Sequence, residues 1–135
     1  MEFVEWKESY NVGVKEIDIQ HRGLFDLVNK LTKTNDYDPE GRYFLLTFIE
    51  FIDYARLHFN TEERYMQEAS YSRFEEHKQA HIDFLAIMKS YLEKLEKKQR
   101  NMENEILDYI KKWYSSHILG FDRDYIEVFR AKGFK

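Results

Sequence analysis

Apolar residues recur at alternating three- and four-residue steps in four stretches of the chain, at about residues 18–33, 39–66, 74–95 and 102–117. This is the period of an amphipathic helix. The chain contains a single Pro and five Gly, so little interrupts these stretches. Because only short connections separate them, neighbouring helices should be antiparallel. The pattern predicts an all-α fold, an up-down-up-down four-helix bundle with an irregular N-terminal arm and a short C-terminal helical extension.

The breaks between the stretches contain residues that suit turns and helix starts. At residues 35–39, Asp38 is suited to the N-cap of the second helix and Pro39 to its first helical position. Residues 69–72 form a second short connection. With 135 residues, of which 43% are hydrophobic, the chain can fill one core. We therefore expect a single domain that spans residues 1–135.

The charge and the cysteine content exclude several classes of function. The formal net charge of -4 comes from 21 basic and 25 acidic residues spread along the chain, which predicts no face for nucleic acid or an anionic membrane. The N-terminus lacks the pattern of a signal peptide, and polar residues interrupt the longest apolar run, from Phe44 to Ile52. We expect a cytoplasmic monomer without stable membrane insertion. Because cysteine is absent, any metal must be bound through nitrogen and oxygen.

Every histidine of the chain falls on the apolar face of a predicted helix: His21, His58, His77, His81 and His117. A lone histidine on such a face is usually a core residue satisfied by a hydrogen bond, but convergence of all five needs another explanation. Glu62 lies one turn after His58 on the same face, as His81 does after His77. A buried, unpaired carboxylate is costly, and this stripe offers no Lys or Arg. The pattern therefore predicts a buried metal site.

Asp122 lies five residues after His117, about 140° around an ideal helix. Both side chains can reach one site only if the helix loosens between them, and Gly120 lies in that gap. The alternative is a helix end followed by a surface Asp. With Asp122 included, five imidazoles and two carboxylates exceed one tetrahedral site and favour two metals. Iron suits such ligands best, while manganese, cobalt or two zinc ions remain open.

Over essentially its whole length the chain resembles the hemerythrins, in their single-domain bacterial form. The resemblance is carried by Ile-Asp-Ile-Gln-His ending at His21, His58-Phe-Asn-Thr-Glu62, His77-Lys-Gln-Ala-His81 and His117-Ile-Leu-Gly-Phe-Asp122. It implies two iron ions that alternate between Fe2+ and Fe3+. One iron would be held by His77, His81 and His117 and the other by His21 and His58. Glu62, Asp122 and a solvent-derived oxo or hydroxo group would bridge them. The second iron would keep an open position, where hemerythrins bind dioxygen.

The resemblance also suggests an apolar wall around the open iron, made by residues one to four positions from a ligand: Leu24, Phe59, Trp113, Tyr114 and Ile118. Each of them could equally be ordinary core. Tyr114 departs from the family, which usually has Leu three residues before this histidine. A buried hydroxyl needs a hydrogen-bond partner. If it faces solvent or another side chain, the ring is a plug that slows oxygen entry and release; if it faces the open iron, it could promote autoxidation. We expect the plug.

The predicted function is reversible dioxygen binding, for storage, delivery or scavenging, and not catalysis. A di-iron oxidase or peroxidase is the first alternative, but ferritin-like oxidative sites use a more carboxylate-rich set with Glu-x-x-His motifs. An oxygen or redox sensor that works through a separate partner is the second. Apart from dioxygen itself, the sequence identifies no partner, neither an oxygen-consuming enzyme nor a reductase.

Overall fold

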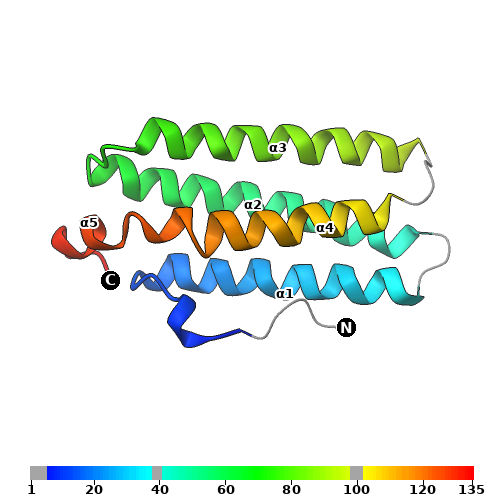
Figure 1. Cartoon of the computed structure of the whole chain (residues 1–135), viewed down its shortest axis with the longest axis horizontal. Coiled ribbons are helices and arrows are strands. Elements are labelled where there is room, and N and C mark those ends of the chain that lie inside the picture. Colours follow the sequence, from blue (N-terminus) through cyan, green and yellow to red (C-terminus); the bar gives the residue numbers. More distant parts are fainter. Residues whose placement is uncertain (1–5, 38–40, 98–101) are drawn as a thin grey trace.

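The structure is a computed structural model that describes residues 6–37, 41–97 and 102–135. Four long helices lie side by side along the molecule (Figure 1): α1 (Lys15–Tyr37), α2 (Arg42–Glu68), α3 (Phe74–Glu96) and α4 (Glu103–Trp113). Helix α1 packs against α2 and α4, and α2 packs against α3. Each helix runs antiparallel to the next, and the described residues contain no strand. The predicted four-helix bundle is confirmed.

Helix α1 is longer than the apolar pattern predicted, because polar residues near its end are satisfied within the helix. The hydroxyls of Thr32 and Thr34 donate to the carbonyl oxygens of Val28 and Leu31, at 3.0 and 2.8 Å. Such back-bonding lets a buried threonine continue a helix without an outside partner. At the other end, the Asp18 carboxylate accepts hydrogen bonds from the backbone N–H groups of residues 12 and 13. These bonds fix the direction in which the arm enters the helix.

Short connections join the helices. Asp38 and Pro39, predicted to begin the second helix, lie outside the described residues; the described α2 begins at Arg42, after Gly41 with a φ of 72°. Helix α2 ends through Ser70, in the left-handed region with a φ of 52°. The N–H of Tyr71 then donates to the carbonyl of Met66 at 3.0 Å, a common way to satisfy the last carbonyl groups of a helix.

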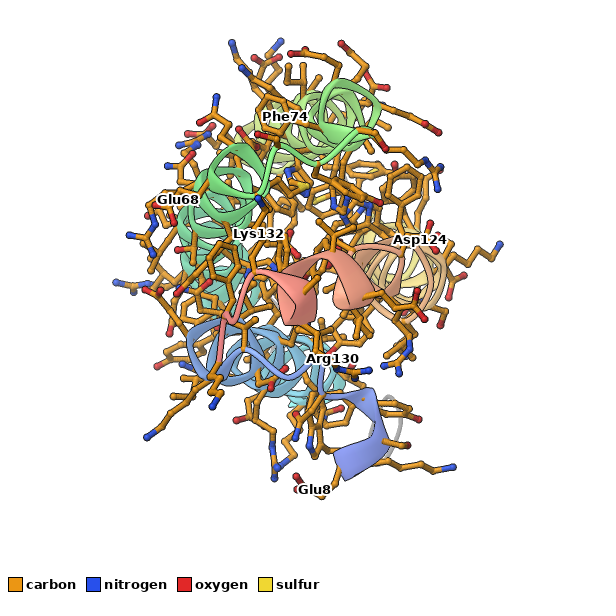
Figure 2. All side chains as sticks on the ribbon, turned by 90° about the vertical axis from the view of Figure 1, so that its left-hand side faces the viewer. Glu8, Glu68, Phe74, Asp124, Arg130 and Lys132 are labelled. Atoms are coloured by element: carbon orange, nitrogen blue, oxygen red, sulfur yellow. The ribbon has the colours of Figure 1, made fainter. Side chains whose placement is uncertain are left out.

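The arm and the C-terminal segment cover one end of the bundle. The arm contains a short 3-10 helix, η1 (Glu8–Tyr10), and α5 (Ile126–Ala131) crosses the end of the four helices (Figure 2). Two apolar clusters result. The main cluster fills the bundle, and the second closes its end with Val12, Val14, Ile17, Met66, Ala69, Tyr71, Tyr125 and Phe129. No described helix has the length and apolar character needed to cross a membrane.

The predicted ligands lie where the two clusters meet. Along α1, His21 stands between Ile17 of the end cluster and Leu24 of the main cluster. Along α2, Glu62 stands between Phe59 of the main cluster and Met66 of the end cluster. The polar residues therefore form a layer with apolar packing on both sides.

Candidate metal centre

All seven predicted ligands are buried, with exposed fractions of 4% or less. Helix α1 supplies His21, α2 supplies His58 and Glu62, and α3 supplies His77 and His81. The last two come from irregular helices that follow α4. His117 lies on a π-helix, η2 (Tyr114–Ile118), and Asp122 lies on a 3-10 helix, η3 (Phe121–Arg123).

The seven side chains form two groups that share both carboxylates. Ligand atoms of Glu62, Asp122, His77, His81 and His117 all lie within 4.8 Å of one another. The same limit holds for a second group, formed by the two carboxylates with His21 and His58. The two groups correspond to the division into three and two histidines that the family resemblance implied.

Asp122 stands between the two groups, with one oxygen toward each. Its Oδ1 atom lies 2.8 Å from Nε2 of His77 and 3.1 Å from Nε2 of His117. Its Oδ2 atom lies 3.1 Å from Nε2 of His21 and 3.9 Å from Nε2 of His58. A carboxylate in this position can bridge two metal ions.

Glu62 is shared less evenly. Its Oε1 atom lies 3.2 Å from Nε2 of His81 and 3.3 Å from Nε2 of His58, which belong to different groups. Its Oε2 atom lies 3.6 Å from Nε2 of His21 and accepts the hydroxyl of Tyr125 at 2.5 Å. The fully buried Tyr125 thus fixes one oxygen of this carboxylate.

Several buried atoms at the centre have no hydrogen-bond partner in the described structure. Nδ1 of His21 and Nδ1 of His77 are two of them. The others are one oxygen of each carboxylate and the Nε2 atoms of His58, His77, His81 and His117, which can act as metal ligands. Each unsatisfied buried group costs about 1–3 kcal/mol. The ion pairs found for Glu62 and Asp122 among the described residues are all with imidazoles. Metal ions would satisfy these nitrogen and oxygen atoms together, so the residues fit a metal centre.

Two outer hydrogen bonds orient the imidazoles. Nδ1 of His58 lies 2.9 Å from Oε1 of Gln20, and the Gln20 amide donates to Thr61 at 3.1 Å. Nδ1 of His81 lies 2.9 Å from Oε2 of Glu63. In both cases Nδ1–H donates, which leaves the Nε2 lone pair facing the centre. Because a carboxylate partner increases imidazole basicity more than a neutral amide does, His81 should be the stronger donor.

Gln20, Glu63 and Tyr125 were missed by the sequence analysis. Gln20 and Glu63 are direct chain neighbours of His21 and Glu62, so they lie about 100° away from the ligand stripe on an ideal helix. Tyr125 follows the irregular segment, where helical periodicity gives no direction. Their only signal in the sequence is proximity to predicted ligands.

The five predicted pocket residues are all buried, with exposed fractions of 9% or less. Phe59 stacks on His81 with ring centroids 3.9 Å apart, and Trp113 stacks on His117 at 4.9 Å. Both contacts are to the three-histidine group. Leu24, Tyr114 and Ile118 belong to the same apolar cluster.

The Tyr114 hydroxyl donates to the main-chain carbonyl of His21 at 3.1 Å. Its ring contacts Phe25 edge-on, with centroids 6.1 Å apart. The expected partner was solvent or another side chain, so the observed partner differs. The hydroxyl is engaged by this hydrogen bond, and the plug interpretation stays a prediction.

In the polypeptide alone, the carboxylates and imidazoles shift one another's pKa values. Burial by itself would lower the pKa of His21, but Asp122 and Glu62 raise it to about 9. Burial would likewise lower the pKa of His81, but the Glu62 and Glu63 carboxylates raise it to about 9. Burial would raise the pKa of both shared carboxyl groups, but the neighbouring imidazoles hold each well below its ordinary value. Without metal, Glu62 and Asp122 are therefore held as ionised carboxylates, and the centre favours positive charge beside them.

Comparison with known proteins gives one consistent family. The hemerythrin HHE cation binding domain matches residues 12–129. A bacteriohemerythrin of Clostridium acetobutylicum is 32% identical over 126 residues, which cover 90% of this chain and 98% of the relative. A myohemerythrin of Sipunculus nudus is 32% identical over 120 residues, covering 89% of this chain and 88% of the relative.

Solved structures agree with these sequence relatives. The crystal structure of a hemerythrin variant with leucine replaced by tyrosine superposes with a TM-score of 0.87 at 26% identity, covering 96% of this chain and 98% of that chain. The wild-type hemerythrin structure has a TM-score of 0.85 at 25% identity, covering 93% of this chain and 97% of that chain.

The first prediction concerns the turn that brings Asp122 to His117. A Cβ at Gly120 would lie 2.6 Å from the main-chain carbonyl oxygen of Ser116, which cannot move independently. Gly120→Ala should therefore lower the free energy of unfolding by about 2 kcal/mol and reduce bound metal, because Asp122 is displaced. Denaturant unfolding and metal analysis would measure both effects.

Gly23→Ala is the matched control for this change. There the new Cβ would meet the hydroxyl end of the Tyr54 side chain, which can swing away. This variant should keep its metal. Equal metal contents in the two variants would show that the turn does not position Asp122.

The second prediction concerns pH and compares the protein with and without metal. The pKa of His21 and His81 rises from 6.5 to about 9, so their stabilising contribution is complete below pH 6.5 and lost as pH rises through 9. The contribution of Glu62 and Asp122 is present above their ordinary pKa values of 4.5 and 3.8 and is lost as pH falls through their lowered values. Chelator-treated protein should therefore melt at a higher temperature at about pH 5.5 than at about pH 9.

Metal-loaded protein should show the reverse order, because metal-bound imidazoles must be neutral and acid below about pH 6.5 competes for them. Melting curves of both forms at the two pH values test this. The same pH order in both forms would contradict the assignment of these imidazoles as ligands.

Proposed function

The chain belongs to the hemerythrin family, and from this premise we propose that its two ligand groups hold two iron ions and that the protein binds dioxygen reversibly. The observation that carries the proposal is the sharing of Glu62 and Asp122 by two groups of buried histidines. A single metal ion would leave part of this set unsatisfied. Two ions joined by two carboxylates use all seven side chains.

In this proposal His77, His81 and His117 bind one iron, and His21 and His58 bind the other. Glu62 and Asp122 would be shared by the two ions, together with an oxo or hydroxo group from solvent. Three histidines and three bridges complete six positions, whereas two histidines and the same bridges leave one position open. A pair of ferrous ions supplies an open coordination position and two electrons, which is the chemistry that reversible dioxygen binding requires.

The surrounding residues favour binding over turnover. Leu24, Phe59, Trp113, Tyr114 and Ile118 are proposed to exclude water from the centre, and their burial supports this role. Phe59 and Trp113 do so on the three-histidine side, where they stack on His81 and His117. The two buried hydroxyls beside the centre are both engaged, that of Tyr114 by a main-chain carbonyl and that of Tyr125 by Glu62. Burial raises the pKa of both phenols, so each retains its proton. Neither is placed to act as an acid toward bound oxygen.

The physiological use would be oxygen storage, delivery to an oxygen-consuming enzyme, or scavenging, with a reductase returning ferric iron to the ferrous state. A di-iron oxidase or peroxidase, or a sensor acting through a separate partner, would use the same ligands. The engaged hydroxyls favour the carrier over an oxidase.

The third prediction tests metal identity and reversibility. Protein loaded with iron without oxygen should contain two irons per chain by elemental analysis. Air should change its absorption spectrum, and purging with argon should restore the original spectrum over repeated cycles. One metal per chain, preferential zinc binding, or a spectral change that never reverses would contradict the proposal.

Two glutamates of α2 provide matched variants for this experiment. Glu62→Gln should reduce iron content because a shared carboxylate is lost. Glu50→Gln should keep both irons, because Glu50 is exposed and pairs with Lys30 at the surface, at 3.3 Å.

The fourth prediction concerns the ring and the hydroxyl of Tyr114. Tyr114→Phe keeps the ring but removes the hydrogen bond to His21, and it should lower the free energy of unfolding by about 1 kcal/mol. Its oxygen-release rate should stay close to that of the parent protein. Tyr114→Leu removes the aromatic plug and should release oxygen faster in stopped-flow measurements. If Phe instead behaves like Leu, the hydroxyl and not the ring controls release.

A further inference from the structure

We propose that Arg73 latches the turn bearing His117 and Asp122 onto α3, and so controls how long the iron beside the three histidines is retained. The proposal rests on the di-iron function above, but it concerns residues outside the ligand set. Arg73 lies immediately before α3, and Phe74 and Asp124 lie on the same end of the bundle (Figure 2).

The guanidinium of Arg73 joins two parts of the chain. Its Nε and Nη2 atoms donate to the carboxylate of Glu76, in the first turn of α3, at 3.1 and 3.0 Å. Its Nη1 atom donates to Asp124 at 2.9 Å. Asp124 directly follows η3, which contains Asp122. One side chain therefore connects the start of the helix that carries His77 and His81 with the turn that carries the shared carboxylate.

Phe121 contacts both the latch and the ligands. The Arg73 guanidinium carbon lies 5.3 Å from the centre of the Phe121 ring. The same ring is nearly parallel to His117, with centroids 5.4 Å apart, and meets His77 edge-on at 4.8 Å. Arg73 is 43% exposed, whereas both imidazoles are buried and Phe121 is partly buried. Phe121 thus packs over the imidazoles of His77 and His117, and the Arg73 guanidinium packs over Phe121.

The turn needs such support because its own backbone is irregular. Residues 114–123 form a π-helix, a turn and a 3-10 helix in place of a continuous α-helix. On the side away from α3, Arg123 donates to the main-chain carbonyl of Ser9 at 3.1 Å and so ties the turn to the arm. Arg73 provides the corresponding tie to α3. Without it, the turn can move away from His77 more easily and expose the iron to water and competing ligands.

The expected effect is moderate, because exposed ion pairs are individually weak. Arg73 differs from an ordinary surface residue in having two carboxylate partners, a two-point contact with one of them, and an aromatic ring beneath it. We expect Arg73→Ala to release iron on the order of fivefold faster than the parent protein.

Arg64→Ala is the matched control. Arg64 is also exposed, donates to Glu16 at 2.8 Å and lies 5.0 Å from the centre of the Tyr65 ring, but its partners lie outside η2 and η3. The wild-type protein and both variants would be loaded with iron, and release to a strong ferrous chelator would be followed by absorbance. Melting temperatures of the metal-free proteins would be recorded in parallel.

If Arg73 acts as proposed, iron must leave Arg73→Ala faster than Arg64→Ala, while the two metal-free variants melt at similar temperatures. The proposal also requires that raising salt from about 0.05 M to about 1 M speeds release from the wild-type protein but not from Arg73→Ala. Arg73→Lys should rescue only in part, because an ammonium lacks the planar fork. If Arg73→Ala folds poorly, Asp124→Asn removes the charge of one partner alone and should release iron faster in the same way.

The outcomes separate the two proposals. If wild-type protein does not retain two irons, the di-iron function fails whatever the variants do. If it retains two irons but Arg73→Ala and Asp124→Asn release them no faster than Arg64→Ala, the latch is wrong and the di-iron function stands.

Discussion

The burial of two carboxylates among five imidazoles is the constraint on which the rest of the structure depends. An apolar core could pack more simply without them, since each unsatisfied atom at the centre costs free energy. The described residues provide the carboxylates with imidazole partners and no lysine or arginine. Metal ions resolve this conflict, so metal binding and folding must be coupled. The helices are held in place by a charged centre as well as by apolar packing.

The surroundings of the centre make its two halves unequal. His81 is oriented by the carboxylate of Glu63, whereas His58 is oriented by the neutral amide of Gln20. Aromatic rings also stack on the three-histidine side, on His81 and on His117. The carboxylate partner of His81 and the stacked rings would both hold a metal ion more firmly on that side. In the proposed di-iron centre, the two-histidine side would be the one that binds dioxygen.

Regular helical geometry explains which features could be predicted from the sequence. The bundle and the pairs His58–Glu62 and His77–His81 follow from a period that places residues four apart on one face. The loosening between His117 and Asp122 was also expected. The loosening begins at Tyr114, before the histidine, and this start was not expected. The choice between an α- and a π-turn depends on contacts made by the whole bundle. For the same reason, the sequence pattern does not indicate partners beside the stripe, such as Gln20. Nor does it indicate the main-chain partner of Tyr114.

The least regular part of the backbone carries one of the two shared carboxylates. Asp122 reaches imidazoles of both groups, yet it lies on a 3-10 helix of three residues that cannot support itself by an α-helical hydrogen-bond ladder. The irregular turn lets Asp122 face both sides of the centre, as Glu62 does from the regular helix α2. In a continuous α4, Asp122 would lie about 140° around the helix from His117. Its placement therefore depends on contacts beyond the turn's own backbone. Arg123 ties the turn to the arm, Arg73 ties it to the start of α3, and metal ions would bind Asp122 itself. Regular helices set the positions of His21, His58, His77 and His81, and the contacts of the turn decide whether His117 and Asp122 reach them.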